Sequence, residues 1–215
     1  MRSSALAAVA AGLVLAACSP TMRAGLQTLQ GAWPQASSVR DAPLDHRLVY
    51  LLVTHQGREA LMVWSGDEPG PLGPTRVWVG ADGVVLRTHQ GRMVGVSEPT
   101  RSWRVVAQAP VPGLPQGEQQ TVDLQPGYRL GLQQTVVRMP LPTPLSEPST
   151  LAFHGPVTGL QWEEENVMSV SARSSLQVGL LARNAQGQVV YGERCLTPEW
   201  CLSWQPWPLD RPGQR

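Results

Sequence analysis

The chain has 215 residues, and its 17 basic residues, all of them Arg, against 16 Asp or Glu give a formal net charge of +1. A chain so close to neutral lacks the basic surface that nucleic-acid binding requires, so no nucleic-acid partner is expected. The 21 Gly and 20 Pro, with only 15% charged residues, predict many turns and few long helices. Apolar residues alternate through most of the chain, which excludes a disordered protein.

The chain begins with the pattern of a secretory signal. Arg2 precedes an apolar run over residues 5–17 that contains only Ala, Val, Leu and Gly. This run is shorter than the roughly 20 residues of a membrane-spanning helix. Its end, Leu15-Ala16-Ala17-Cys18, resembles the lipobox of bacterial lipoproteins. The alternative is an ordinary cleaved signal, in which the cysteine at the cut is accidental.

The lipobox resemblance implies cleavage before Cys18 and transfer of a diacylglyceryl group, carrying fatty acids such as palmitate, to its thiol. Ser19 follows, rather than Asp, which resembles the sorting rule for the outer membrane of many Gram-negative bacteria. We therefore expect a lipid anchor in the outer membrane, on the periplasmic face. Loss of Arg2 with residues 1–17 leaves 16 basic and 16 acidic residues, and hence no net charge.

The rest of the chain divides into a lipidated N-terminus with a tether over residues 18–43 and a single β-rich domain over residues 44–215. The first part of this domain alternates short apolar runs with Gly-containing turns, which is typical of β-hairpins. Strands are predicted at residues 48–53, 60–64, 75–79, 84–87 and 93–96. Residues 66–74, rich in Pro and Gly, are predicted to form a loop.

In the middle of the chain, residues 109–127 are predicted to form a loop excursion with one strand-like piece at 120–124. Residues 128–137 alternate as a strand does, and residues 139–148, with four prolines, are predicted to form a linker or an edge segment. Further strands are predicted at 157–162, 167–172, 176–183 and 188–191. The pattern predicts an all-β, mainly antiparallel fold, either a β-sandwich or a partly open β-barrel built from meanders, with little helix.

Two cysteines remain once Cys18 is lipidated, and they lie close together in the sequence. Cys195 and Cys201 are separated by Leu-Thr-Pro-Glu-Trp. In an exported protein such a pair most often forms a disulfide. A thiol redox pair and a metal site are the alternatives, but the spacing differs from that of thioredoxin-like motifs and no His lies nearby.

The sequence Thr-His-Gln-Gly-Arg occurs twice, at residues 54–58 and 88–92, each time between two predicted strands. One interpretation is a duplicated ligand loop that pairs His55 with His89. The other is repeated use of a good turn, with Gly at positive φ. We favour the turn, because nothing else around the two copies matches.

No catalytic constellation stands out in the sequence. His46, His55, His89 and His154 form no close metal-ligand pair. The run Glu163-Glu164-Glu165 offers an acid pair or a cation site, but neighbouring strand residues point to opposite faces, so it is predicted to cap a strand in water. The chain is therefore predicted to be no enzyme and to hold no cofactor or metal.

The chain has 8 Trp and only 1 Phe. Trp64 and Trp78 lie in predicted strands among apolar neighbours and are predicted to be core residues. Trp200, Trp204 and Trp207 lie in a Pro-containing tail, where they either pack over the sheet or form an exposed surface for a sugar or a protein partner.

One segment resembles a known family. Residues 78–94, Trp-Val-Gly-Ala-Asp-Gly-Val-Val-Leu-Arg-Thr-His-Gln-Gly-Arg-Met-Val, resemble the W-x-S-A-D-G-x-x-L-x-T-x-x-G-R-L-V segment of the YjbF/GfcB family, lipoproteins of exopolysaccharide and group 4 capsule operons. The matching positions are Trp78, Ala81, Asp82, Gly83, Leu86, Thr88, Gly91 and Arg92. The sequence departs from the family after this segment, at Gly95-Val96-Ser97-Glu98-Pro99, and in its Cys195–Cys201 loop.

The resemblance implies a non-enzymatic lipoprotein that assists capsule or exopolysaccharide assembly or export. Its expected partners are the membrane, through the lipid anchor, and outer-membrane export proteins or the polysaccharide itself. A general periplasmic binding or envelope-assembly module unrelated to polysaccharide is the alternative. A third hypothesis is a hydrolase of envelope sugars that uses Glu163, Glu164 and Glu165 with His154.

Overall fold

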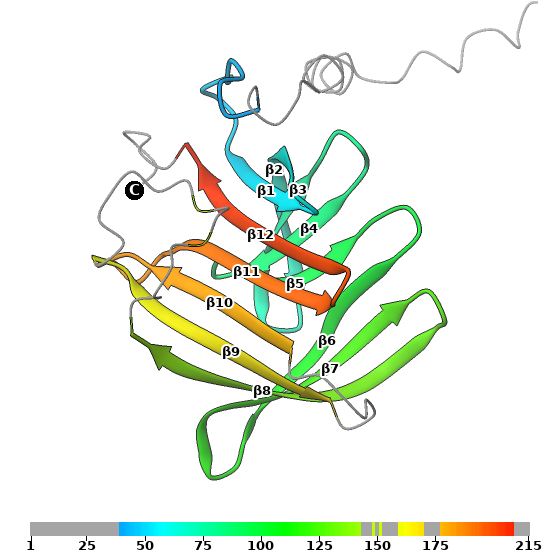
Figure 1. The fold of residues 1–215 in the computed structure, drawn as a ribbon. Coiled ribbons are helices and arrows are strands. Elements are labelled where there is room, and N and C mark those ends of the chain that lie inside the picture. The colour runs from blue at the N-terminus through cyan, green and yellow to red at the C-terminus, as the bar shows by residue number, and fades with distance from the viewer. Residues whose placement is uncertain (1–38, 143–147, 149–150, 152–158, 170–176, 209–215) are drawn as a thin grey trace, which may run out of the picture.

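The computed structural model describes residues 39–142, 148, 151, 159–169 and 177–208. These residues form twelve antiparallel strands that close into one barrel (Figure 1). The strands are β1 (Tyr50–His55), β2 (Arg58–Gly70), β3 (Gly73–Val79), β4 (Val85–His89), β5 (Arg92–Ser97), β6 (Ser102–Val111), β7 (Leu114–Gln125), β8 (Arg129–Leu141), β9 (Gln161–Ser169), β10 (Gln177–Arg183), β11 (Val189–Thr197) and β12 (Trp200–Trp207).

Each strand pairs with its neighbours in sequence, and β1 pairs with β12 to close the barrel. That last ladder runs from Tyr50 opposite Trp207 to His55 opposite Leu202. The all-β, antiparallel prediction is confirmed, but the barrel is closed rather than partly open, and it is not a sandwich. Closure requires the first strand, β1, to pair with the last, β12, and β12 lies in the Pro-containing segment that was interpreted as a tail.

Two identical hairpin turns explain the repeated Thr-His-Gln-Gly-Arg sequence. In both copies the His lies opposite the Arg in the ladder, so the turn consists of Gln and Gly alone. Gln56 and Gln90 both have φ 50°, and the following Gly57 and Gly91 have φ 73° and 81°. Two consecutive residues at positive φ form the turn that matches the twist of paired strands. The repeat therefore reflects the use of the same turn in two hairpins, as predicted.

Several prolines lie inside strands, which the sequence analysis did not expect. The predicted loop over residues 66–74 belongs largely to β2 and β3, with Pro69 opposite Pro74. The predicted excursion over residues 109–127 is the long β6–β7 hairpin, and Pro140 lies in β8 opposite Glu163. All these prolines lie near strand ends at one end of the barrel, where a missing N–H donor disrupts little of the ladder.

The C-terminal third also differs from the prediction. The segments 157–162 and 167–172 were predicted as two strands, but β9 is one strand through Gln161–Ser169. The strand predicted at 188–191 extends to Thr197 as β11. Glu163, Glu164 and Glu165 interrupt the apolar pattern in the middle of β9, which is why the sequence suggested a break there.

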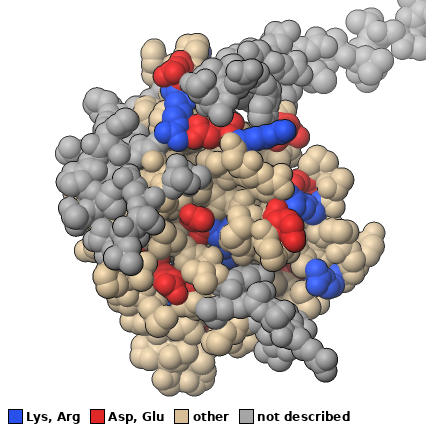
Figure 2. All heavy atoms as spheres, viewed as in Figure 1, with Lys and Arg blue, Asp and Glu red and all other residues tan. Residues whose placement is uncertain are grey.

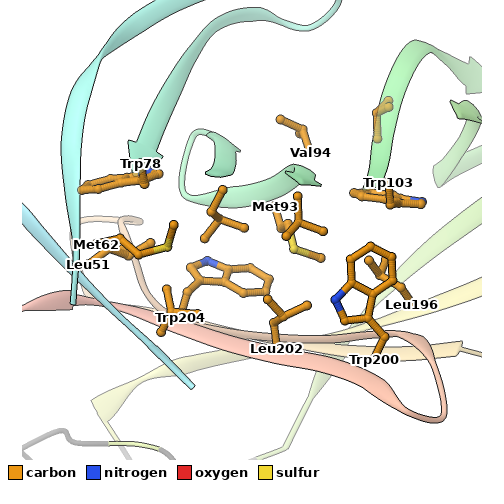
Figure 3. Packing of buried hydrophobic residues seen from close by; sticks show 14 of the residues in the cluster. Leu51, Met62, Trp78, Met93, Val94, Trp103, Leu196, Trp200, Leu202 and Trp204 are labelled. Carbon is orange, nitrogen blue, oxygen red and sulfur yellow. The ribbon is translucent and has the colours of Figure 1, made fainter. Parts of the chain in front are cut away.

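Apolar side chains fill much of the barrel interior. Side chains from β1 to β7 and from β10 to β12 form its main core, in which Trp78 and Trp103 lie along one wall and Trp200 and Trp204 extend from the facing strand β12 (Figure 3). Leu, Val and Met side chains fill the space between the rings. We call this set of residues the tryptophan core.

Two smaller apolar clusters lie on other surfaces of the sheet. Val39, Leu44 and Leu48 pack against Tyr50 and Trp207 of β1 and β12. Leu151 and Leu160 lie in a second cluster with Trp162, Ala182 and Tyr191 of β9, β10 and β11. Segments that precede β1 and β9 thus cover parts of the strands. Among the described residues, no helix is long and apolar enough to cross a membrane.

Candidate functional site

The residues of the 78–94 segment divide into two groups. Asp82 and Gly83 shape the β3–β4 turn, where the Asp82 carboxylate accepts a hydrogen bond from the Val84 N–H at 3.1 Å and Gly83 has φ 80°. Trp78, in contrast, is buried, and its Nε1–H donates to Oγ1 of buried Thr88 at 2.9 Å. The motif therefore links an exposed turn to the barrel interior.

The β4–β5 turn contacts the opposite wall of the barrel. The Gly91 carbonyl accepts a hydrogen bond from Trp204 Nε1–H at 2.8 Å. A Cβ at Gly91 would lie 2.6 Å from the Cβ of Val189 in β11, so only glycine allows this close approach. Gly91 is thus required both by its positive φ and by its neighbour across the barrel.

Arg92, the last residue of the motif, joins a cluster of charged side chains. Its Nε and Nη2 atoms lie 3.0 and 2.7 Å from Oε1 of Glu165 in β9. Arg138 of β8 contacts the same carboxylate at 3.1 Å and also pairs with Glu118 of β7. Arg194 of β11 lies 3.9 Å from the other Glu165 oxygen. We call these five residues the arginine cluster.

Glu165 is the centre of the arginine cluster, because three guanidinium groups approach its carboxylate. It is only 4% exposed. Burial raises its pKa, but the positive charges of Arg92, Arg194 and Arg138 outweigh that effect and hold the pKa below its usual value. The prediction that the glutamate run caps a strand in water is therefore wrong for this residue. The expectation that neighbouring glutamates point to opposite faces is confirmed. Glu164 lies on the other face of β9, where it accepts a hydrogen bond from the Asn166 side chain.

Arg194 is the most deeply buried cation of the described residues, at 2% exposure. Its guanidinium lies over the ring of Trp103, 4.6 Å from the centroid. Burial lowers its pKa, and Glu165 opposes that shift. Its Nε and Nη2 atoms are buried and have no hydrogen-bond partner among the described residues. Gly179, opposite Arg194 in β10, leaves room for the Glu165 side chain.

A ladder of glutamine side chains continues the polar lining across β6, β7 and β8. Gln134 Nε2 donates to Gln120 Oε1 at 3.0 Å, and Gln120 Nε2 donates to Gln108 Oε1 at 3.0 Å. Gln120 and Gln134 are buried. This part of the interior is thus polar, and it meets the tryptophan core where Arg194 lies over the Trp103 ring.

The arginine cluster adjoins an open pocket at one end of the barrel, which we call the mouth. The pocket has a volume of about 220 Å³ and is lined by Pro115, Gln116, Arg138, Met139, Pro140, Glu163 and Arg183. Arg138 belongs to both the pocket and the cluster. At the rim, Arg183 donates to Glu163 at 3.3 Å and to the Gly187 carbonyl at 3.0 Å.

A second polar group lies at the opposite end of the barrel. Trp200 Nε1–H donates to Glu98 at 2.8 Å, and Arg101 pairs with Glu98 at 2.7 Å while stacking over the Trp200 ring. His55 lies 3.0 Å from Arg101 and 2.9 Å from the Cys201 carbonyl. Each side chain of this group contacts another one, so the group links the β5–β6 connection to the β11–β12 turn.

The three tail tryptophans do not form a surface. Trp200 and Trp204 belong to the tryptophan core, and Trp207 is buried against Tyr50. Of the two alternatives, packing is confirmed and the exposed surface for sugar or partner contact is wrong, because the tail is strand β12 and its rings are buried. Trp78 is buried as predicted, whereas Trp64, predicted as core, is 40% exposed beside a bulge in β2.

His55 and His89 do not come together in the structure. His55 lies near Cys201, and His89 contacts the Pro74 carbonyl at 2.9 Å at the other end of the barrel. The duplicated ligand loop is therefore wrong, and His154 lies outside the described residues. Within the described part of the chain, no group of three or more His, Cys, Asp or Glu residues is placed to hold a metal ion.

Two further sequence predictions concern cysteines. Cys195 and Cys201 are joined by a disulfide across the β11–β12 turn. Cys18, the expected lipidation site, lies outside the described residues. Charged side chains on the face seen in Figure 2 lie in small groups of mixed sign.

Comparison with known proteins supports the fold. No protein-family model matches the chain, and no curated protein matches it. Among solved structures, the hypothetical lipoprotein YmcC from Escherichia coli K12 is similar, with a TM-score of 0.54 and 12% sequence identity over 89% of this chain and 96% of that chain. At this identity the likeness shows a shared barrel fold.

Proposed function

We propose that this chain is a lipoprotein of the outer membrane, anchored through Cys18 and facing the periplasm, where it assists capsule or exopolysaccharide assembly or export without catalysing a reaction. Three observations support this. The N-terminus resembles a lipobox, the barrel resembles a solved lipoprotein over nearly its whole length, and residues 78–94 resemble the YjbF/GfcB motif.

The observation that carries the proposal is the placement of the motif residues. Trp78, Thr88, Gly91 and Arg92 all lie in or against the barrel interior. Trp78 donates a hydrogen bond to Thr88, the Gly91 carbonyl accepts one from Trp204, and Arg92 donates to Glu165. The resemblance therefore includes residues that determine how the interior is built, as well as turn residues that recur in many unrelated hairpins. A shared interior is stronger support for a shared role than a shared turn.

The arrangement of the carboxylates argues against the hydrolase hypothesis. Glu165 is held ionised among arginines, so it is unsuited to donate a proton. Glu163 pairs with Arg183, and Glu164 lies on the opposite face. Glu163 and Glu165 share a face of β9, but each is paired with arginine, so neither is a free acid for a substrate.

Deletion of the gene tests the proposed function directly. Surface polysaccharide, measured as polymer per cell and as the fraction exported, is expected to fall and to be restored by the wild-type gene. A Cys18→Ala gene is expected to restore it poorly, since the protein would lose its anchor. Unchanged polymer amount and export in the deletion strain would contradict the proposal and favour a general envelope-assembly module.

A further inference from the structure

The arginine cluster has an excess of positive charge. Its three arginines and two glutamates leave one net positive charge inside the barrel. Arg194 carries the least compensated of these charges, because its closest carboxylate oxygen is 3.9 Å away and two of its nitrogens have no hydrogen-bond partner among the described residues. A buried charge that is only partly compensated is unfavourable, so the site favours a bound counter-charge.

The cluster is open to solvent from the mouth. The side chains of Arg92, Glu118 and Arg138 retain exposures of 16, 19 and 22%, although Arg194 and Glu165 below them are almost fully buried. The pocket of about 220 Å³ reaches Arg138 directly. This volume is several times the roughly 30 Å³ of one liquid water molecule, so a small anionic group fits in it.

Guanidinium groups determine which ligand chemistry fits. Arg is always charged, and its planar set of N–H donors matches the paired oxygens of a carboxylate or a phosphate. Arg92, Arg138 and Arg194 all contact one carboxylate, that of Glu165, so their donors converge on a small volume. The excess of one positive charge fits a ligand with a single negative charge.

We propose that the mouth and the arginine cluster form a binding site for an oxyanion, which is held at Arg138, where the pocket meets the cluster, and balances the excess positive charge of the cluster. In the cell we take this oxyanion to be the carboxylate of an acidic sugar, an assignment that rests on the proposed function. The pocket lining of Pro115, Met139 and Pro140 offers apolar surface to the sugar ring, while the arginines bind the carboxylate.

Binding is tested with the full-length lipidated protein in detergent micelles. Glucuronate, inorganic phosphate and glucose are titrated at constant ionic strength, and binding is followed by calorimetry and by the thermal unfolding midpoint. At about 100 times its Kd, glucuronate is expected to raise Tm by about 5–10 °C. Glucose, which has the same ring without the carboxylate, is expected to leave Tm unchanged.

Two variants locate the site. Arg194→Met removes the excess charge and is expected to weaken glucuronate binding at least tenfold. Arg104→Gln is the matched control, because Arg104 is exposed on β6 and only loosely paired with Glu68 at 3.7 Å, so it removes the same charge away from the cluster. It is expected to bind as the wild type does. Arg138→Gln, at the pocket, is a second test of the same contact and is expected to weaken binding.

The outcomes separate the parts of the proposal. Absence of any effect of glucuronate and phosphate, or full binding by both Arg194→Met and Arg138→Gln, would overturn the oxyanion site. Binding of phosphate without glucuronate would support the oxyanion site and refute the acidic sugar. Glucuronate binding by a protein whose deletion leaves surface polysaccharide unchanged would support the site and contradict the proposed function.

Discussion

The two regions of the barrel interior, the tryptophan core and the arginine cluster, are built by opposite means. The tryptophan core consists of large rings and aliphatic side chains, and the indole N–H groups of Trp78, Trp204 and Trp200 donate to Thr88, Gly91 and Glu98. The arginine cluster consists of charges that remain incompletely paired. A densely packed core such as the tryptophan core stabilises the fold. The incompletely paired charges of the arginine cluster reduce stability unless a counter-charge compensates them, and such a feature is typical of a functional site.

Removing a tryptophan ring is expected to have the largest effect. Trp204→Ala deletes a buried ring that packs against Gly192 and bonds to Gly91, and should lower the free energy of unfolding by about 3–5 kcal/mol. Trp64→Ala, at an exposed position, should lower it by about 1 kcal/mol or less. Urea unfolding followed by far-UV circular dichroism measures both, and equal losses would contradict a core centred on Trp204.

Removing the central carboxylate should have the next largest effect. Glu165→Gln leaves three arginines facing one glutamate and should lower the free energy of unfolding by about 3 kcal/mol, the lower end of the range for a broken buried pair, because solvent still reaches Arg92 and Arg138. Glu164→Gln is the matched control on the other face and should change it by less than about 1 kcal/mol. A loss no larger for Glu165→Gln than for Glu164→Gln would show that the cluster is not held by this carboxylate.

Acid should weaken the same contact. The pKa of Glu165 is lower in the folded protein than the ordinary value of a glutamate, about 4.5, so its contribution is fully present above about pH 4.5 and is lost as the pH falls through the lower folded-state pKa. Between pH 6 and pH 3, the wild type should therefore lose more stability than Glu165→Gln does. Parallel pH profiles of the two proteins would refute the assignment of a lowered pKa to Glu165.

The hydrogen bond inside the motif should have the smallest effect. Trp78→Phe and Thr88→Val each remove one partner and should lower the free energy of unfolding by about 1–2 kcal/mol. Because both remove the same bond, the double variant should lose less than the two single losses combined, by about 1 kcal/mol. Additive losses in urea unfolding would indicate that the bond contributes nothing.

The sequence predicted the region of the tryptophan core better than that of the arginine cluster. Alternation and turn residues located most strands of β1 to β5, and the Gln-Gly and Asp-Gly turns have the expected positive φ. The same rules failed where prolines lie in strands near the mouth and where Glu163, Glu164 and Glu165 interrupt β9. Pattern rules assume that strands bury apolar residues, so a strand that buries a glutamate looks like a loop.

The arginine cluster could not have been found by spacing, because its members come from β5, β7, β8, β9 and β11 and are up to about a hundred residues apart. Only the closure of the barrel brings Arg92 to Glu165 and Arg194. One signal was available, since Arg92 is a motif position that a simple turn does not require. The closing of β1 on β12 was missed for a similar reason, because Trp200, Trp204 and Trp207 lie beside prolines and look like an irregular tail.

The free energy of unfolding of Arg194→Met in a buffer free of carboxylates, phosphate and sulfate is the most direct test of the contrast between the two regions. If Arg194 is an uncompensated charge kept for a ligand, the variant should be as stable as the wild type within about 1 kcal/mol, or more stable, despite losing the cation–π contact with Trp103. A loss of about 3 kcal/mol or more would show that Arg194 is a structural residue like Trp204, and would contradict this account.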